Sequence, residues 1–367
     1  MPIVNGAYDA PTWNNNAPPA IDASELQDIC DTIETYNTQK ADVDYVNTFV
    51  RPNLLDNWYF VGGGSQQGGG QFPINQRRST AYSTGAYTID RWYNRQNLSV
   101  SLVSGGLKIQ LSSTGGYPFF SQRLENGNYF LGKTLTVSVM ISEVSPNFKG
   151  VRLDVDLSNN VSTNSTNYPS TATFCTAPGV YSATATLPST SNYSGVNCSL
   201  YFGANNRAAG DYCVISAIKL ELGSTQTLAH QENGVWMLNE HPNYQQELAR
   251  CQRFYYNAIQ IHTGGYGKCG LAIATSTSAL TMVLPLPVSM RTAPTLTYKG
   301  EWRVCGGSSY SFYDVTNIAL AQASEQSGGN LAAINLTATG AILTTGQPYM
   351  LQVSADTTAD ICLSADL

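Results

Sequence analysis

The sequence predicts a mainly β protein with a short N-terminal helix, an antiparallel β-sandwich and a C-terminal β-sandwich head. Three observations predict this class. Apolar residues alternate with polar ones through most of the chain, which is typical of strands that bury one face. Charged residues make up 12% of the chain, against about 25% in ordinary soluble domains. Residues 157–206 contain no Asp, Glu, Lys or Arg, and a solvated helix there would need such residues on its outer face.

The N-terminal segment, residues 1–52, predicts an extended arm followed by a helix. Residues 1–20 are rich in Pro and Asn, the composition of an arm. Capping boxes at 22–25 and 24–27 then indicate a helix start. Apolar residues follow at a spacing of about 3.5, which predicts a short coiled coil that self-associates, although a single amphipathic helix packed on its own domain would show the same pattern. The seam residues are Leu26, Ile29, Ile33, Tyr36, Val43, Val46 and Val50.

The remaining chain divides into three segments. Residues 53–228 contain several period-two runs separated by Gly, Asn and Ser, without an intervening helix pattern, so they predict an antiparallel sandwich. The clearest runs are 107–111, 135–141, 151–157 and 218–222. Residues 229–254 predict a connector of irregular chain that leads into a short helix. Residues 255–367 resume the strand pattern with only ten charged residues and predict the second sandwich.

Charge and hydropathy exclude several classes of function. The net charge is −6 and no Lys/Arg cluster stands out, so no nucleic-acid partner is expected. No apolar run approaches the roughly 18 residues that a membrane span requires, so no membrane insertion is expected. The N-terminus has no signal-peptide pattern, which predicts synthesis in a cytosol. The eight cysteines are scattered singly, which predicts buried free thiols rather than a zinc site.

Motifs that could indicate catalysis lie in sequence contexts that do not support it. Residues 127–134 match the phosphate-loop pattern G-x-x-x-x-G-K-[ST], but a strand pattern follows where the chemistry needs a helix. A turn at Asn126-Gly127 is the better interpretation. Arg152, Asp154 and Asp156 share one face of a predicted strand, which we interpret as a solvated sheet face. The three histidines have no metal-ligand spacing. We therefore predict no catalytic residues, no cofactor and no metal.

Aromatic residues on polar segments are the best candidates for recognition. Sugars are commonly held by apolar rings together with hydrogen bonds from polar side chains. The candidates for receptor contact in the C-terminal segment are Tyr266, Trp302, Tyr310, Tyr313 and Asp314. Packing in the core or between strands is the alternative for each ring.

Several short stretches resemble tail-fibre and receptor-binding proteins of tailed bacteriophages and of prophages of Gram-positive or gut bacteria. One of them, the Lys40–Val46 run, is similar to segments of trimeric fibre coiled coils. Residues 62–70, which are rich in Gly, depart from the usual shorter spacing. The stretches are Asn53–Phe60, Asn75–Arg77, Tyr87–Trp92, Lys219–Gly223, Thr227–His230, Glu247–Phe254, Leu363–Leu367 and Lys40–Val46.

The resemblance implies a homotrimer, so that the N-terminal seam would be a trimer seam. It also implies a carbohydrate-binding-module-like jelly roll at residues 53–228 and an N-terminal arm that attaches to other tail or virion proteins. We therefore expect a non-enzymatic virion protein, made in the bacterial cytoplasm, that adheres to a host-surface glycan. A purely structural part, such as a collar, capsid fibre or baseplate spacer, is the alternative. An enzyme that depolymerises surface glycan is a third possibility.

Overall fold

The computed structural model divides the chain into two compact units, Met1–Arg51 and Pro52–Leu367. In the first unit, residues 28–29 and 31–32 are helical. The arm and the rest of the predicted coiled coil, apart from Val50, lie outside the described residues, as do residues 63–70. The structure describes residues 28–29, 31–32, 50–62, 72–78, 81–82, 85–158, 167–168, 174–189, 194–261, 267–306, 311–321, 331–340, 343–354 and 359–366.

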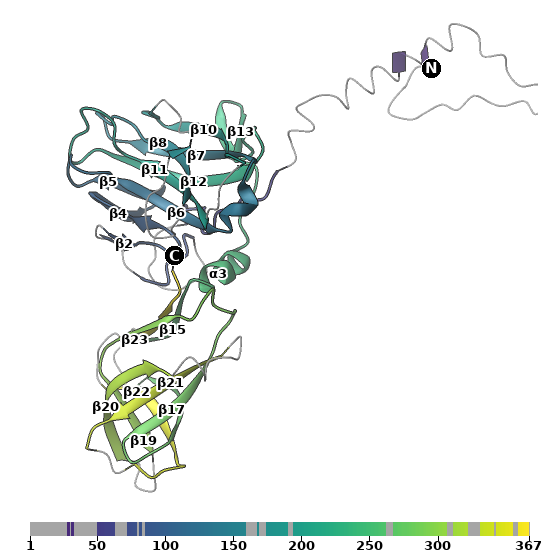
Figure 1. The fold of residues 1–367 in the computed structure, drawn as a ribbon. Coiled ribbons are helices and arrows are strands. Elements are labelled where there is room, and N and C mark those ends of the chain that lie inside the picture. Colours follow the sequence, from purple (N-terminus) through teal and green to yellow (C-terminus); the bar gives the residue numbers. More distant parts are fainter. Residues whose placement is uncertain are drawn as a thin grey trace, which may run out of the picture. The chain divides into compact units, whose positions relative to one another are not determined.

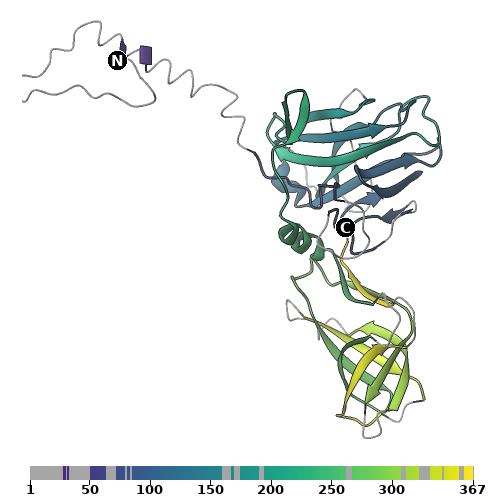
Figure 2. The same ribbon diagram turned by 180° about the vertical axis from the view of Figure 1, so that it is seen from behind.

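The first half of the second unit contains two antiparallel six-stranded sheets that face each other, as Figures 1 and 2 show from opposite sides. The order across the first sheet is β1 (Ala81–Tyr82), β4 (Leu98–Val103), β5 (Gly106–Leu111), β12 (Tyr212–Leu222), β7 (Thr134–Val144) and β10 (Gly179–Thr186). The order across the second sheet is β2 (Ala86–Tyr87), β3 (Tyr93–Asn94), β6 (Phe119–Glu125), β11 (Gly195–Tyr201), β8 (Arg152–Ser158) and β9 (Asn167–Tyr168).

One apolar core fills the space between these sheets, because the inward positions of each strand are aliphatic or aromatic. Leu107, Ile109 and Leu111 of β5 are buried, as are the apolar residues that alternate with polar ones in β7 and β8. The ring of Trp92 stacks on that of Phe120, with centroids 5.0 Å apart. The period-two runs at 107–111, 135–141, 151–157 and 218–222 are thereby confirmed as strands.

The segment after the sandwich covers part of the outer face of β12. The carboxylate of Glu221 accepts hydrogen bonds from the backbone N–H and the hydroxyl of Thr227, at 2.6 and 2.5 Å. Beside it, the buried Lys219 donates to Glu240 at 2.6 Å. The chain then forms a hairpin, where irregular chain was expected, and the predicted short helix. These elements are β13 (Ala229–Glu232), β14 (Val235–Leu238) and α3 (Tyr244–Gln252).

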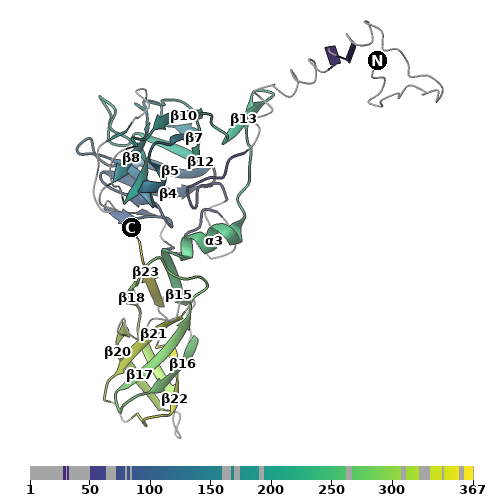
Figure 3. The ribbon, with the colours of Figure 1, turned by 45° about the vertical axis from the view of Figure 1, so that its right-hand side comes forward.

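The C-terminal segment is not the predicted second sandwich. Six strands close into a barrel, seen in Figure 3, and three others form a separate small sheet. Around the barrel the strands are β16 (Lys268–Ala274), β17 (Ala279–Pro285), β21 (Leu331–Ala338), β20 (Ser311–Leu320), β19 (Trp302–Gly306) and β22 (Pro348–Val353). The small sheet has the order β15 (Tyr255–Ile261), β23 (Ala359–Ser364) and β18 (Thr295–Lys299).

The physical reason for the barrel is the size of the inward side chains. Small residues such as Ala272 and Ala332 alternate with larger ones such as Leu280 and Ile334 in its interior. A barrel of few strands needs small and large residues in alternation to fill its narrow interior. Closure also removes exposed strand edges. Period-two alternation is the same in a sandwich and in a barrel, so the sequence pattern did not separate the two.

Three local expectations have clear outcomes. The rejection of the phosphate loop is confirmed, because Gly127–Phe130 form a short 3-10 helix (η1) and strand β7 follows from Thr134. Asn126 precedes η1 with a φ of 60°, the left-handed conformation that such a turn requires. The cysteines of the described segments are free thiols, and all but Cys269 are buried, as expected.

The predicted solvated face of β8 is wrong. Asp154 is fully buried and Asp156 is nearly so. Arg152 explains part of this, because its Nε and Nη2 atoms each donate to the Asp154 carboxylate at 2.8 Å. The Arg152 guanidinium also lies 4.6 Å from the centre of the Tyr201 ring on the neighbouring strand. A paired carboxylate can be buried at little cost, and a charged residue therefore need not mark a solvated position.

Candidate functional site

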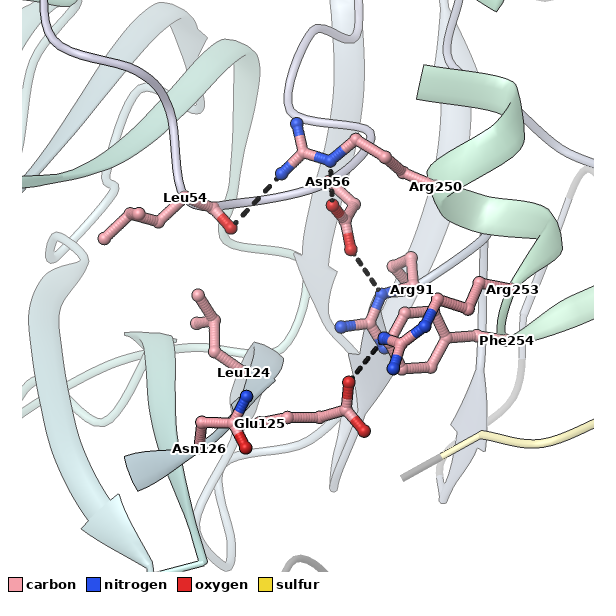
Figure 4. A pocket seen from close by; sticks show the side chains of 9 residues that line it. All are labelled: Leu54, Asp56, Arg91, Leu124, Glu125, Asn126, Arg250, Arg253 and Phe254. Carbon is pink, nitrogen blue, oxygen red and sulfur yellow. Dashed lines mark hydrogen bonds and ion pairs between the residues drawn. The ribbon is translucent and has the colours of Figure 1, made fainter. Parts of the chain in front are cut away.

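A pocket of about 250 Å³ lies where the end of β6 meets α3 and the chain that follows it (Figure 4). Apolar side chains and charged side chains both line it. They come from the segment that precedes β1, the turn before β3, the junction of β6 with η1, and the end of α3. The lining residues are Leu54, Asp56, Arg91, Leu124, Glu125, Asn126, Arg250, Arg253 and Phe254.

Helix α3 is held against the sandwich by Glu247. The helix begins at Asn243, whose side chain accepts from the backbone N–H groups of Gln245 and Gln246, at 3.0 and 3.2 Å. One turn later the buried Glu247 accepts from the backbone N–H of Asn57 at 2.6 Å and from Arg250 at 2.8 Å. Burial raises the pKa of Glu247, and Arg250 opposes that rise. This contact places Arg250 at the rim of the pocket.

Asp56 is the central acceptor of the pocket. Its carboxylate forms ion pairs with Arg91 Nε at 2.8 Å and with Arg250 Nε at 2.6 Å. Its backbone is fixed by Gln122, which accepts from Asp56 N and donates to Asp56 O, both at 2.7 Å. The carboxylate therefore joins the sandwich to α3 through two guanidinium groups.

Arg91 forms the floor of the pocket and is 3% exposed. Its backbone has a φ of 75°, a left-handed conformation that is rare for side chains other than Gly, Asn and Asp. Nε donates to Asp56, and Nη2 donates to the backbone O of Arg123 at 2.7 Å. The guanidinium carbon lies 3.4 Å from the centre of the Phe254 ring. Nη1 has no hydrogen-bond partner within the described segments.

The opposite wall is formed by Glu125, the last residue of β6. Arg253 Nη1 pairs with this carboxylate, and Arg291 Nη1 lies 3.6 Å from it. Figure 4 shows the guanidinium of Arg91 between Asp56 on one side and Glu125 on the other. The pocket thus has a charged floor and charged walls, with Leu54 and Leu124 beside them.

A second charged group lies close by around Asp90. This carboxylate is fully buried, accepts from Gln76 Nε2 at 2.7 Å, and lies 3.8 Å from Arg77 Nε. Burial raises the pKa of Asp90 to about 7, against the opposing effects of Arg77 and Gln76. Arg77 also pairs with Asp366 at 2.5 Å and lies 3.8 Å from the centre of the Tyr255 ring. This group connects the sandwich to β15 and to the residues that follow β23.

The residues predicted for receptor contact do not come together in the described part of the chain. Tyr266 and Tyr310 lie outside the described residues. Trp302 lies in β19 with its ring buried in the barrel core, and its indole N–H donates to Lys299 O at 2.8 Å, so the expected exposed ring at 302 is wrong. Tyr313 lies in β20 and is half-buried against the ring of Tyr349 in β22, and the neighbouring Asp314 is exposed. Receptor contact by Tyr313 and Asp314 stays a prediction.

The predicted trimer seam is described at two positions. Ile29 is 44% exposed and Val50 is 39% exposed. Leu26, Ile33, Tyr36, Val43 and Val46 lie outside the described residues. The seam therefore stays a prediction.

The pocket was not predicted from the sequence. Most of its residues lie in the stretches Asn53–Phe60, Tyr87–Trp92 and Glu247–Phe254, which carried the resemblance to tail-fibre proteins. The sequence feature that could have indicated the pocket was its charged residues. In a chain with 12% charged residues, Arg250 and Arg253 lie three residues apart on one helix pattern, and such a pair needs partners.

The described segments contain no group of three or more His, Cys, Asp or Glu side chains that could hold a metal ion. Within the same segments, no helix is long and apolar enough to cross a membrane.

Comparison with known proteins gives no family. No family model matches the chain, and no curated protein matches it. Among solved structures, one described as CBM4 is 17% identical and covers 39% of this chain and 85% of its own, with a TM-score of 0.26. The CBM22 tandem domain of Paenibacillus barcinonensis Xyn10C is 8% identical and covers 77% of this chain and 96% of its own, with a TM-score of 0.26.

A third solved structure is a cycloisomaltooligosaccharide glucanotransferase from Paenibacillus sp., in complex with cycloisomaltoheptaose. It is 8% identical and covers 76% of this chain and 46% of its own, with a TM-score of 0.19. All three TM-scores lie below 0.5, so these likenesses carry no argument about the function of this chain.

Proposed function

We propose that this protein is a structural adhesin of a tailed bacteriophage, a tail-fibre or receptor-binding subunit that binds a glycan of the bacterial surface and catalyses nothing. The observation that carries the glycan part is the pocket between β6 and α3. It combines the apolar side chains of Leu54, Leu124 and Phe254 with clustered hydrogen-bond donors and acceptors.

Sugars need this combination because each ring has apolar C–H faces and a rim of hydroxyl groups that both donate and accept. Asp56 and Glu125 are acceptors, and Arg91, Arg250 and Arg253 are donors. At about 250 Å³ the pocket is at the small end of ligand sites, which span roughly 300–1,000 Å³. This size suits one sugar unit, or the end of a chain, better than an extended polysaccharide.

The phage part of the proposal is supported by sequence. The stretches that resemble tail-fibre proteins supply Asp56, Arg91 and Arg250 to the pocket. In this proposal the sandwich is the carbohydrate-binding-module-like jelly roll, the N-terminal arm attaches to other virion proteins, and the seam of Ile29 and its neighbours is a coiled coil. The protein then ends up in the virion after synthesis in the host cytoplasm.

The proposed trimer has a further support on the barrel. Leu271 and Ile273 of β16, Val283 of β17 and Leu331 of β21 are each more than half exposed. Strands β16, β17 and β21 are neighbours, so these side chains form one apolar face. Contiguous apolar surface of this kind commonly marks an interface between proteins. A copy of the same chain offers a matching uncharged face.

The absence of catalysis is part of the proposal. A glycosidase needs two carboxyl groups at the scissile bond, one of which donates a proton. Asp56 and Glu125 both line the pocket, but each is bound by two guanidinium groups and serves as an acceptor. Release of reducing ends from host polysaccharide by the purified protein would overturn this part.

A structural virion part is the second candidate, and one observation favours it. The ion pair between Arg250 and Asp56, and the hydrogen bond from the backbone N–H of Asn57 to Glu247, connect α3 to the sandwich, which a spacer would need for stiffness. The two candidates differ in one measurable property. An adhesin binds host cells saturably, whereas a spacer does not.

The proposal predicts that Arg253→Gln weakens adsorption of the full-length protein to host cells at least tenfold. Arg253 is suited to this test because its side chain is 45% exposed at the rim, so its loss should leave the fold intact. Binding of labelled protein to cells would be titrated for wild type and variant, with melting temperatures measured alongside.

Arg207→Gln is the matched control, because it removes the same charge at the other end of β6, where Arg207 donates to Gly116 O. It should adsorb like wild type. Saturable adsorption that Arg253→Gln leaves unchanged would remove the pocket from the proposal. Absence of any saturable adsorption would favour the spacer.

A further inference from the structure

The pocket has more donors than acceptors, and this bears on the kind of sugar it binds. Three arginines line it, Arg91, Arg250 and Arg253, and a fourth, Arg291, lies 3.6 Å from the carboxylate of Glu125; each has five N–H donors. Three carboxylates face them, those of Asp56, Glu125 and Glu247. The cluster therefore carries a positive charge in a protein whose net charge is −6.

Among the described lining residues of the pocket, only Arg91 has a buried side-chain donor without a partner. Its side chain is buried, and the Phe254 ring and the Asp56 carboxylate hold the guanidinium in one position. Nη1 is buried and has no partner among the described residues, although buried donors are generally hydrogen-bonded. A buried donor without a partner beside a pocket is one that an acceptor group of a ligand can satisfy.

The carboxylates already in the pocket do not block an acidic ligand. Asp56 is bound by Arg91 and Arg250, and Glu125 by Arg253 and Arg291. Each is thus neutralised by two cations, and Arg250 also pairs with Glu247. At the rim, Arg253 is 45% exposed and can share its planar fork between Glu125 and a ligand oxygen.

We infer that the pocket selects an acidic sugar, one that bears a carboxylate or a phosphate, whose anionic group meets Arg91 Nη1 and the exposed side of Arg253. This inference rests on the proposed glycan-binding function and narrows its ligand class. Carboxylate and phosphate oxygens are the groups for which the arginine fork has the best geometry. Leu54 and Leu124 then contact the apolar part of the sugar.

The test compares acidic oligosaccharides with their neutral parents on the full-length protein. The probes are glucuronate-bearing oligosaccharides, sugar-phosphate-bearing oligosaccharides, and the corresponding neutral glucosides, with affinity measured by titration calorimetry. At least one acidic class should bind ten times or more tightly than its neutral parent. The two acidic arms show whether the pocket takes a carboxylate or a phosphate.

Variants distinguish recognition of the anionic group from recognition of the rest of the sugar. Arg253→Gln should lower the acidic-to-neutral preference to about one, whereas Arg253→Lys should keep part of it, because Lys retains the charge but not the fork. Arg207→Gln should leave the preference unchanged. Equal affinity for acidic and neutral sugars, or a preference that survives Arg253→Gln, would overturn the inference and leave glycan binding standing. Binding of none of these probes, together with no adsorption to cells, would overturn both.

Discussion

Asp90 shows how one buried carboxyl group makes stability depend on pH. Burial raises its pKa to about 7, while an unfolded Asp titrates near 4. Between these values the folded protein holds a proton that the unfolded chain lacks, so this group contributes stability at low pH that is lost as the pH rises toward 7. The slope from one group is at most about 1.4 kcal/mol per pH unit.

We predict that Asp90→Asn raises the free energy of unfolding more at pH 8 than at pH 5. The amide removes the buried charge, and its oxygen can still accept from Gln76. Urea unfolding of both proteins at several pH values between 5 and 8 measures the difference. A constant difference across that range would mean that Asp90 is not the titrating group.

The pocket itself could be predicted from the sequence only in part, and the limit is a matter of separation along the chain. Asp56 and Arg250 form one ion pair although almost the whole sandwich separates them in sequence. The Arg250 and Arg253 spacing indicates a charged helix face, but nothing local identifies Asp56 or Glu125 as its partners. The position of the unpaired donor of Arg91 depends on a left-handed backbone conformation that no residue pattern predicts.

At the scale of elements, α3 depends on its contacts with the sandwich, above all that of Glu247, more than on its own helix propensity. We predict that Glu247→Ala lowers the free energy of unfolding by about 2–3 kcal/mol, because it leaves the buried N–H of Asn57 and part of Arg250 without an acceptor. Equilibrium unfolding in urea measures this loss.

Gln246→Ala is the control on the same helix. This side chain is exposed, so its removal should change stability by less than about 0.5 kcal/mol. Glu247→Gln keeps one acceptor oxygen and should fall between the two. Equal stability of Glu247→Ala and Gln246→Ala would show that the contact does not hold the helix.

The elements were the most predictable level of this structure. Alternation of apolar and polar residues predicted the positions of β5, β7 and β8, because one face of each strand packs in the apolar core. The same alternation in β17, at Leu280, Met282 and Leu284, predicted a strand but not the sheet to which the strand belongs. Whether strands stack as two sheets or close into a barrel depends on pairing between distant segments, such as β16 with β22, which alternation does not encode.

At the scale of the whole molecule, the apolar face of the barrel predicts self-association. Purified protein should have the mass of a trimer at low and high salt, because apolar contacts are not screened. Val283→Lys with Leu331→Lys should shift the mass toward the monomer, since both side chains point outward and a charge there opposes burial. Analytical ultracentrifugation measures this change.

Asn317→Lys is the control, an exposed residue of β20 away from that face. It should keep the wild-type mass. Circular dichroism should show an unchanged β spectrum for all variants. If the double variant and wild type have the same mass, the apolar face is not an interface between copies.

The central place of β23 in the small sheet has a consequence for biosynthesis. Strand β23 lies between β15 and β18 and pairs with both, yet it leaves the ribosome last of the three. Roughly 100 residues separate β15 from β23, and at about 5–20 residues per second β15 waits on the order of 5–20 s for its partner. During that interval β15 and β18 expose unpaired edges, so chains crowded on one polysome risk pairing with one another. The order of synthesis therefore makes the nascent chain, more than the finished protein, the form that needs a chaperone.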